Sequence, residues 1–296
     1  MFSIIVCSIR PEQAATLEHN IASTIGVPFE FIAFDNRGTG KGICAVYNEC
    51  AERAKYDLLC FVHEDVAFHT QNWGEILAAK LSENDCGVIG FAGGTTKFAY
   101  PYGWCSIDDF SCMHYIQSGG RKGPIEVKYA CHDDYSKVVT LDGLCQFVRR
   151  DVWKKIRYDE VTFPNFHSYD TDFSTAVFVA GYNNYVCNKV LIEHFSLGSF
   201  NRVWFDSERT YLKKWGKHLP LFANEESIRE QMAKEKRVWD KSLRRLGRMG
   251  TISGKDACYA WFRFVRRYPF SMSSYVMPFR ILKYKLLHKK YKRMYQ

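Results

Sequence analysis

The sequence lacks several features that would place it in a specialised class. It has no uninterrupted apolar run of the roughly 18 residues that a membrane-spanning helix needs. Its first residues, MFSIIVCSIRPE, are too short and lack the charged start of a signal peptide, so we expect a cytoplasmic protein. No internal repeat or low-complexity segment stands out. The sequence has no obvious Gly-rich, Lys-containing phosphate loop near the N-terminus, which argues against a nucleotidyltransferase.

Paired cysteine motifs are also missing. The chain has 11 cysteines, an odd number, and none forms a C-x-x-C pair. Several lie inside apolar runs, namely Cys7, Cys60, Cys145 and Cys187. This usage favours buried thiols in a reducing compartment over a disulfide framework or a structural zinc site.

Net positive charge is confined to the C-terminal region. Residues 241–296 hold fifteen Lys and Arg and one acid, Asp256, for a net charge of +14. The whole chain of 296 residues carries +9, so the other 240 residues sum to −5 (9 minus 14). A body that follows nucleic-acid phosphates should itself be basic, so nucleic acid is not the expected partner of the main domain.

Hydrophobic residues make up 47% of the chain, enough for a substantial core. Apolar runs alternate with amphipathic segments through the first 93 residues. The predicted strands are 2–8, 29–34, 57–62 and 86–93, and the predicted helices are 11–23, 43–55 and 70–83, the last with Thr70 as N-cap. Such alternation is typical of an α/β fold with a mostly parallel, Rossmann-like sheet covered by helices on both faces.

The remaining segments are assigned more coarsely. Residues 95–140 indicate loops with short strands at 125–130 and 137–141. Helices are predicted at 148–156, at 169–182 with Gly181 near the end, at 211–220 and at 225–247, and a strand is predicted at 184–195. Three glycines, Gly247, Gly250 and Gly254, mark a break before the basic tail.

Polar residues follow the predicted strands where the strands end. They are Ser8, Asp35 and the run His63-Glu64-Asp65. In parallel sheets, ligands bind beyond the carboxyl ends of the strands, so these groups should share a crevice. With a diphosphate present, Glu64 and Asp65 would suit Mg²⁺ or Mn²⁺. The alternative is a solvated strand end that is acidic by chance.

Other candidate groups have equally plain alternatives. His194 ends an apolar strand and is either structural or a metal ligand from a distant strand. Asp170 and Asp172 begin a helix, where they either stabilise its N-terminus or provide a general base. Asp142-Gly143 is either a turn or a sugar contact.

Taken in order, these segments resemble the inverting, GT-A-fold family 2 glycosyltransferases, in particular a bacterial branch linked to capsule and other surface polysaccharides. The resemblance covers roughly residues 2–200. Its pieces are SIIVCSIRPE, FDNRGTGKGICAVYNECAERAKYDLLCFVHEDV, DGLCQFVRRDVWKKIRYDE, FHSYDTDFSTAVFVAGYNNYV and IEHFSLGS. Each piece is weak alone, and their order and spacing make the match specific.

The resemblance implies a metal-dependent hexosyltransferase that takes a sugar from a nucleotide-diphosphate donor to a saccharide or lipid-linked saccharide hydroxyl. It implies roles for matching positions. The residues that would bind the nucleotide-sugar donor are Ser8, Asp35, Asn36, His63, Glu64 and Asp65. Asp65 and His194 would bind Mn²⁺ or Mg²⁺, and Asp170 or Asp172 would be catalytic. Asp142 and Gly143 would contact the sugar or the acceptor.

Two positions depart from the family pattern. His63 stands where the D-x-D motif has its first Asp, and Tyr169 stands where an E-D pair has its Glu. The second departure leaves Asp172 as an alternative to Asp170 for the base. Two other functions stay open: a catalytically silent GT-A-like module that binds saccharides or membranes, and a nucleotidyltransferase on a similar sheet.

The tail supports three interpretations. Residues 257–296 hold eleven aromatic residues, and Tyr284, Leu287, Tyr291 and Tyr295 recur at helical spacing among lysines. Such a helix either lies on an anionic membrane surface or packs its stripe onto the main domain. Binding of RNA or single-stranded DNA ranks third, because the main body is acidic. We therefore expect a GT-A catalytic domain at 1–204, a helical extension at 205–250 and a basic aromatic tail at 251–296, with localisation in the cytoplasm or peripheral on the inner face of the membrane.

Overall fold

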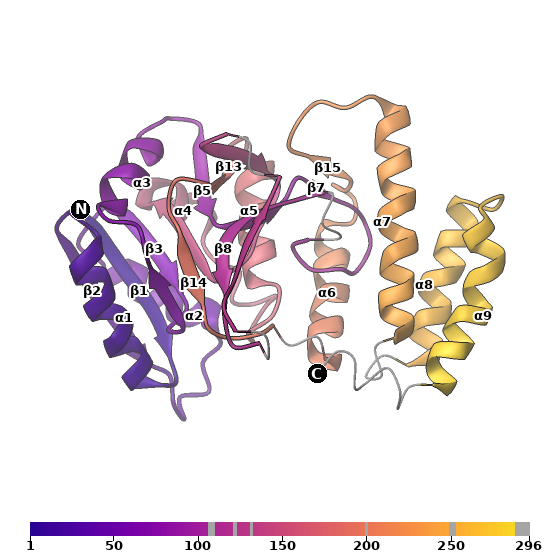
Figure 1. Cartoon of the computed structure of the whole chain (residues 1–296), viewed down its shortest axis with the longest axis horizontal. Coiled ribbons are helices and arrows are strands. Elements are labelled where there is room, and N and C mark those ends of the chain that lie inside the picture. The colour runs from indigo at the N-terminus through magenta and orange to yellow at the C-terminus, as the bar shows by residue number, and fades with distance from the viewer. Residues whose placement is uncertain (106–109, 121–122, 131–132, 199–200, 249–252, 288–296) are drawn as a thin grey trace. The chain divides into compact units, whose positions relative to one another are not determined.

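The structure, a computed structural model, describes residues 1–105, 110–120, 123–130, 133–198, 201–248 and 253–287 (Figure 1). The chain forms two compact units. The first comprises Met1–Lys97, Gly103–Gly198 and Pro220–Asn224, and the second comprises Phe98–Tyr102, Ser199–Leu219 and Glu225–Gln296. The division into catalytic domain, extension and tail stays a prediction.

A seven-stranded sheet forms the centre of the first unit. Its strands run in the order β10 (Tyr135–Val138), β13 (Asn183–Cys187), β5 (Cys86–Gly90), β12 (Cys145–Arg149), β3 (Leu58–Val62), β1 (Phe2–Ser8) and β2 (Phe29–Asp35). β1 is parallel to β2 and β3, and β13 is parallel to β5. β12 and β10 run antiparallel to their neighbours. The predicted mostly parallel α/β fold is confirmed.

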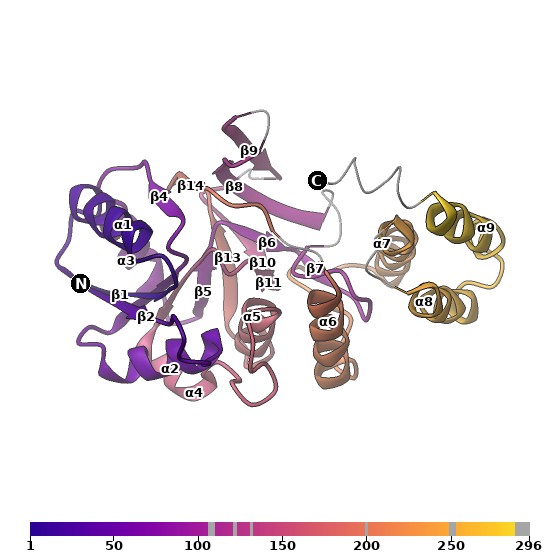
Figure 2. The same cartoon turned by 90° about the horizontal axis from the view of Figure 1, so that it is seen from below.

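Helices cover both faces of this sheet because its strands are apolar on both sides. Figure 2 shows α1 (Pro11–Thr24) and α3 (Trp73–Leu81) on one face, and α2 (Ile43–Arg53), α4 (Arg150–Ile156) and α5 (Tyr169–Val179) on the other. On the first face, Trp73 packs on Phe147 of β12 with ring centroids 5.6 Å apart. On the second, Tyr47 packs on Phe61 at 4.9 Å.

A second sheet lies next to the strand ends. Its order is β11 (Thr140–Leu141), β6 (Ala92–Gly94), β8 (Ser111–Gln117), β14 (Ile192–His194) and β4 (Val66–Phe68), with β9 (Ile125–Tyr129) paired to β8. A two-stranded sheet pairs β7 (Thr96–Lys97) with β15 (Leu221–Phe222). Three predicted strands are each divided between the two larger sheets: 86–93 into β5 and β6, 137–141 into β10 and β11, and 184–195 into β13 and β14.

Several local predictions are corrected. Thr70 is not the N-cap of α3. Asn72 holds that position with φ +57°, and the Thr70 hydroxyl accepts a hydrogen bond from the Leu191 amide at 2.8 Å instead. Gly181 does follow the end of α5 with φ +94°, a conformation that favours glycine. β8 and β12 were not predicted.

The described part of the second unit is mostly helical. It contains α6 (Arg202–Trp215), α7 (Ile228–Arg248), α8 (Gly254–Arg267) and α9 (Met272–Leu286). Tyr284 is half-buried and Leu287 follows the end of α9, whereas Tyr291 and Tyr295 of the predicted stripe lie outside the described residues. No helix among the described residues combines the length and hydropathy needed to cross a bilayer.

Candidate active site

The ends of β1, β2 and β3 bring the first predicted group together. Ser8 and Asp35 are paired in the register of β1 and β2, and the Asn36 amide donates to the Ser8 carbonyl at 2.7 Å. The Asn36 side chain donates to the Lys41 carbonyl at 2.9 Å, which holds the turn after β2. Parallel pairing therefore places these three residues at the carboxyl ends of neighbouring strands, as predicted.

Glu64 links the end of β3 to the end of β1. Its Oε2 accepts from the Ser8 hydroxyl at 2.6 Å and from the Arg10 amide at 2.9 Å. The Ile9 amide donates to the same oxygen at 3.1 Å. Hydrogen bonds to a carboxylate are stronger than neutral ones, so this contact holds the loop before α1 in place.

Asp35 forms a second charged pair at this edge. Arg37 donates to it through Nε at 2.9 Å and through a terminal nitrogen at 2.6 Å. These bonds lower the pKa of Asp35 to about 2. Both side chains are more than half exposed, so the pair positions the turn but adds little stability.

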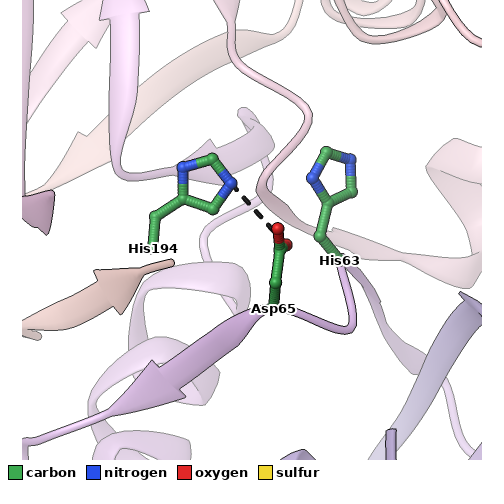
Figure 3. A group of neighbouring side chains, drawn as sticks. All are labelled: His63, Asp65 and His194. Atoms are coloured by element: carbon green, nitrogen blue, oxygen red, sulfur yellow. Dashed lines mark ion pairs between the residues drawn. The ribbon is translucent and has the colours of Figure 1, made fainter. Parts of the chain in front are cut away.

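The described residues include one cluster with the donor atoms of a metal site. One ligand atom each from His63, Asp65 and His194 lies within 4.8 Å of the others. The His194 Nε2 is 3.6 Å from an oxygen of Asp65. Figure 3 shows the Asp65 carboxylate between the two imidazole rings. Two imidazoles and a carboxylate suit Mn²⁺ and similar divalent cations, so the residues fit the implied metal.

Backbone pairing explains why residues so distant in sequence meet here. His194 pairs with Val66 in the antiparallel register of β14 and β4. The Phe195 amide donates to the Asp65 carbonyl at 3.0 Å. The His63 amide donates to the Leu144 carbonyl at 3.0 Å, which connects the end of β3 to the loop before β12.

A chain of hydrogen bonds connects this cluster to Asp170. His63 Nε2 lies 2.8 Å from the Tyr169 hydroxyl. That hydroxyl donates to the Gly143 carbonyl at 3.0 Å, and the Gly143 amide donates to Asp170 Oδ2 at 2.9 Å. Burial raises the pKa of Tyr169, so the hydroxyl keeps its proton. Burial also lowers the pKa of His63, against the attraction of Asp65, and favours a neutral imidazole.

The two candidate bases differ in accessibility. Asp172 is only 2% exposed, whereas Asp170 is half-buried and lies on the first turn of α5. Asp142 is half-buried, and its Oδ1 accepts from the Leu144 amide at 2.8 Å. Gly143 leaves no space for a side chain, since a Cβ there would lie 2.1 Å from the Tyr169 hydroxyl.

The predicted residues thus form two groups near the carboxyl ends of the central strands. The first group surrounds Ser8 and the second surrounds Asp65, with His63-Glu64-Asp65 contributing to both. Sequence reasoning missed Tyr169 as a site residue, and it placed His63 with the donor but not in the metal cluster. The one available signal was that both depart from the family pattern.

Similarity to solved structures is limited to the fold. S. aureus TarS 1–349, solved in complex with UDP-GlcNAc, is 13% identical, with a TM-score of 0.57, 99% of this chain covered and 91% of that chain. GalNAc-T7, solved with UDP, GalNAc and Mn²⁺, is 8% identical, with a TM-score of 0.50 and 73% of this chain covered. The match spans 48% of the GalNAc-T7 chain. These likenesses support a GT-A fold.

No curated protein is significantly similar to the chain in sequence. A family model described as "Glycosyltransferase like family" matches residues 3–218, well over half of the chain. The match includes the strand ends and every residue of the two site groups. The chain therefore belongs to this glycosyltransferase-like family and is an enzyme of the family 2 type.

Proposed function

We propose that the chain transfers a sugar from a nucleoside-diphosphate donor to a hydroxyl of a saccharide or lipid-linked saccharide, with inversion and with a divalent cation. The observation that carries the proposal is one connected site: the His63-Asp65-His194 cluster is joined through Tyr169 and Gly143 to Asp170. A leaving-group site and a base site are thus held together by the same rigid elements.

The two site groups divide the reaction between them. Ser8, Asp35 and Asn36 bind the nucleoside, and Asp65 and His194 hold the cation. When bound, that cation neutralises charge on the leaving diphosphate. Gly143 connects Tyr169 to Asp170 through its carbonyl and its amide, and we assign contacts with the transferred sugar to Asp142 and Gly143.

Asp170 is the general base. Its Oδ2 accepts from the Gly143 amide at 2.9 Å and its Oδ1 from the Thr171 hydroxyl at 3.4 Å, and we assign to this carboxylate the proton of the acceptor hydroxyl. The hydroxyl then attacks the anomeric carbon as the bond to the diphosphate breaks, so a single displacement inverts the configuration. Asp172, at 2% exposure, is too enclosed to reach an acceptor.

An exposed aromatic ring next to the site supports a saccharide acceptor. Phe166 is 53% exposed, and its ring centroid lies 5.7 Å from that of His63 and 6.0 Å from that of Tyr169. An exposed ring at a binding site offers a flat apolar surface for stacking. We expect Phe166→Ala to raise the acceptor KM and leave hydrolysis of the donor nearly unchanged.

The test is a transfer and hydrolysis screen of nucleoside-diphosphate sugars, starting with UDP-GlcNAc and UDP-GalNAc, with Mn²⁺ and with Mg²⁺. Asp170→Asn keeps an acceptor for the Gly143 amide, and its kcat should fall by about 10²-fold to 10⁴-fold. Asp57→Asn is the matched control because the Asp57 side chain is 92% exposed. Release of pyrophosphate from nucleoside triphosphates, without sugar transfer, would refute the proposal, as would a product that retains its anomeric configuration.

We further propose that the enzyme acts in bacterial surface polysaccharide synthesis and reaches a lipid-linked acceptor from the membrane surface. Helix α9 supports this because it is apolar on two sides. One side, with Met277 and Ile281, is buried in the second unit. The other side is exposed and consists of Met272, Tyr275, Phe279, Leu282 and Leu286, with Phe270 just before the helix.

The exposed side has the residues that suit binding to an anionic lipid surface. Phe270 is 94% exposed and Phe279 is 74% exposed. Two basic residues are exposed as well, Arg267 at the end of α8 and Lys283 on α9. Aromatic groups enter the interface while nearby basic groups meet anionic headgroups. In sedimentation with phosphatidylcholine vesicles, we expect binding to increase when phosphatidylglycerol is added.

Phe270→Ser with Phe279→Ser should reduce vesicle binding by about 10-fold or more, since burying one such side chain contributes roughly 1.5–3 kcal/mol. Val161→Ser is the control, because Val161 is 87% exposed but belongs to the first unit. Equal binding by the double variant and the control would rule out this surface.

A further inference from the structure

The two residues that depart from the family pattern contact each other. His63 replaces the first Asp of the D-x-D motif, Tyr169 replaces a Glu, and the His63 Nε2 lies 2.8 Å from the Tyr169 hydroxyl. Tyr169 is 3% exposed, and its ring packs 5.9 Å from Tyr47 and 6.0 Å from Tyr158. A ring packed this way keeps its hydroxyl at a fixed position.

The direction of these hydrogen bonds determines the tautomer of His63. A tyrosine hydroxyl has one proton, and here it donates that proton to the Gly143 carbonyl, which can only accept. The hydroxyl oxygen must therefore accept from His63, so Nε2 carries the imidazole proton. The other nitrogen, Nδ1, then has a free lone pair.

That lone pair is directed into the cluster. Figure 3 shows the ring nitrogen adjacent to the Cβ-bearing carbon of His63 facing the Asp65 carboxylate, while the second nitrogen points away. One ring nitrogen of His63 and one ligand atom each of Asp65 and His194 lie within 4.8 Å of one another. A hydrogen bond from the non-ligating nitrogen to a fixed acceptor is the usual way in which proteins orient a metal-binding histidine.

We propose that His63 is a third protein ligand of the cation, through Nδ1, that Tyr169 is its positioning residue, and that the resulting two-histidine, one-carboxylate set selects Mn²⁺ and similar transition ions over Mg²⁺. This rests on the cation site of the proposed function. Nitrogen donors favour transition ions, whereas Mg²⁺ prefers oxygen ligands, so the substitution of His for Asp changes the selectivity of the site.

The first experiment measures binding of Mn²⁺ alone to the full chain, without donor, by the electron paramagnetic resonance signal of free Mn²⁺. His63→Gln should weaken binding by about 10-fold to 100-fold, and Tyr169→Phe, which removes only the hydroxyl, should weaken it by about 10-fold. His19→Gln is the matched control, since His19 is an exposed histidine on α1, and it should bind like the wild type.

The second experiment counts nitrogen ligands on the bound Mn²⁺ by electron spin-echo modulation. The wild type should show two imidazole nitrogens and His63→Gln one. His63→Asp should bind Mg²⁺ more tightly relative to Mn²⁺ than the wild type does, in competition titrations. Tighter relative binding of Mg²⁺ by His63→Asp is a gain of affinity, so a loss of folding cannot explain it.

The outcomes separate the inference from the function on which it rests. A wild-type signal with one imidazole nitrogen, or equal Mn²⁺ affinity in His63→Gln, overturns the role of His63 and leaves Asp65 and His194 as ligands. No Mn²⁺ binding by the wild type removes the cation from both proposals. Unchanged affinity in Tyr169→Phe, with weakened binding in His63→Gln, refutes only the positioning role of Tyr169.

Discussion

Gly143→Ala should damage the site by displacing Tyr169 and Asp170. The new Cβ would lie 2.1 Å from the Tyr169 hydroxyl, 2.6 Å from Cζ of the same ring and 3.0 Å from the Cβ of Asp170. Ordinary contact begins near 3.4 Å, so the hydroxyl would have to retreat by more than 1 Å. Gly143 does not have a positive φ, so the expected effect is steric and not backbone strain.

The cost follows from how little space Tyr169 has. Its ring is enclosed by Tyr47 and Tyr158, and its hydroxyl bonds to His63 and to the Gly143 carbonyl would lengthen. Forcing an extra carbon into such a packed region costs typically about 1–3 kcal/mol of unfolding free energy. For a protein of this size, each kcal/mol lowers the melting temperature by about 2–4 °C.

Activity should fall further than stability would explain. A shift of about 1 Å in a catalytic group can reduce the rate by about 10²-fold, and the same displacement moves both the proposed base and the residue that orients His63. We therefore expect kcat to fall by about 10²-fold at a temperature where the variant remains folded.

The assay combines urea unfolding with kcat at saturating donor. Gly120→Ala is the control because no atom lies within 4 Å of the position that its Cβ would take. Adding Tyr169→Phe to Gly143→Ala removes the closest clashing atom, so the double variant should lose less stability than the two single losses combined. If Gly143→Ala has the stability and the kcat of the wild type, the close approach of Gly143 to the Tyr169 hydroxyl is refuted.

Three further predictions concern the first and second units. Asn184→Ala leaves the Val88 amide and the Val139 and Ser174 carbonyls without their side-chain partner, so urea unfolding should show a loss of more than about 3 kcal/mol. The half-buried neighbour Asn183 makes one side-chain bond to Asp85, so Asn183→Ala should lose no more than about 1 kcal/mol. Arg37→Gln should raise the pKa of Asp35 from about 2 toward 3.8 in a carboxylate NMR titration, because the variant loses the guanidinium that donates to the ionised carboxylate. The pair stabilises the folded state above pH 3.8, and that stabilisation disappears as the pH falls toward 2. An unchanged pKa would contradict the pairing. Cys258→Ser should remove one fast equivalent of reaction with a disulfide reagent, because Cys258 is the one exposed thiol of the ten described, and an unchanged fast phase would contradict its exposure.

Strand and helix order in the first half could be predicted because each buried strand is a short apolar run that ends at a polar residue. β1 ends at Ser8, β2 at Asp35 and β3 just before His63, as the sequence pattern indicates. The helices between them are amphipathic and long enough to show their period. Local hydrophobicity is sufficient for this part of the fold.

The second sheet could not be predicted in the same way. The runs 86–93 and 184–195 are apolar throughout, yet each crosses from one sheet to the other. A residue buried in either sheet is equally apolar, so hydrophobicity contains no mark of the crossing. β12 was missed for a related reason: its antiparallel position between β3 and β5 depends on long-range pairing.

The strand-end pattern predicted the group of Ser8, Asp35 and His63-Glu64-Asp65, and the family resemblance implied the role of each residue. No short-range rule brings Asp65 near His194, because the pairing of β4 and β14 does so. The two departures from the family pattern lie at separate positions in the sequence. Since the His63 and Tyr169 side chains meet, one departure accommodates the other, and a sequence comparison made one position at a time cannot detect that relation.

The run His63-Glu64-Asp65 shows why three polar residues can follow a buried strand without leaving any of them unpartnered. The Tyr169 hydroxyl is the partner of His63, the loop after β1 provides the partners of Glu64, and His194 lies next to Asp65. Each partner comes from a different segment, so the turn after β3 joins β1, β14 and α5 at one point. A nucleotide-sugar site needs that convergence, because the nucleoside, the diphosphate and the acceptor hydroxyl have to be held by separate segments at fixed positions relative to one another.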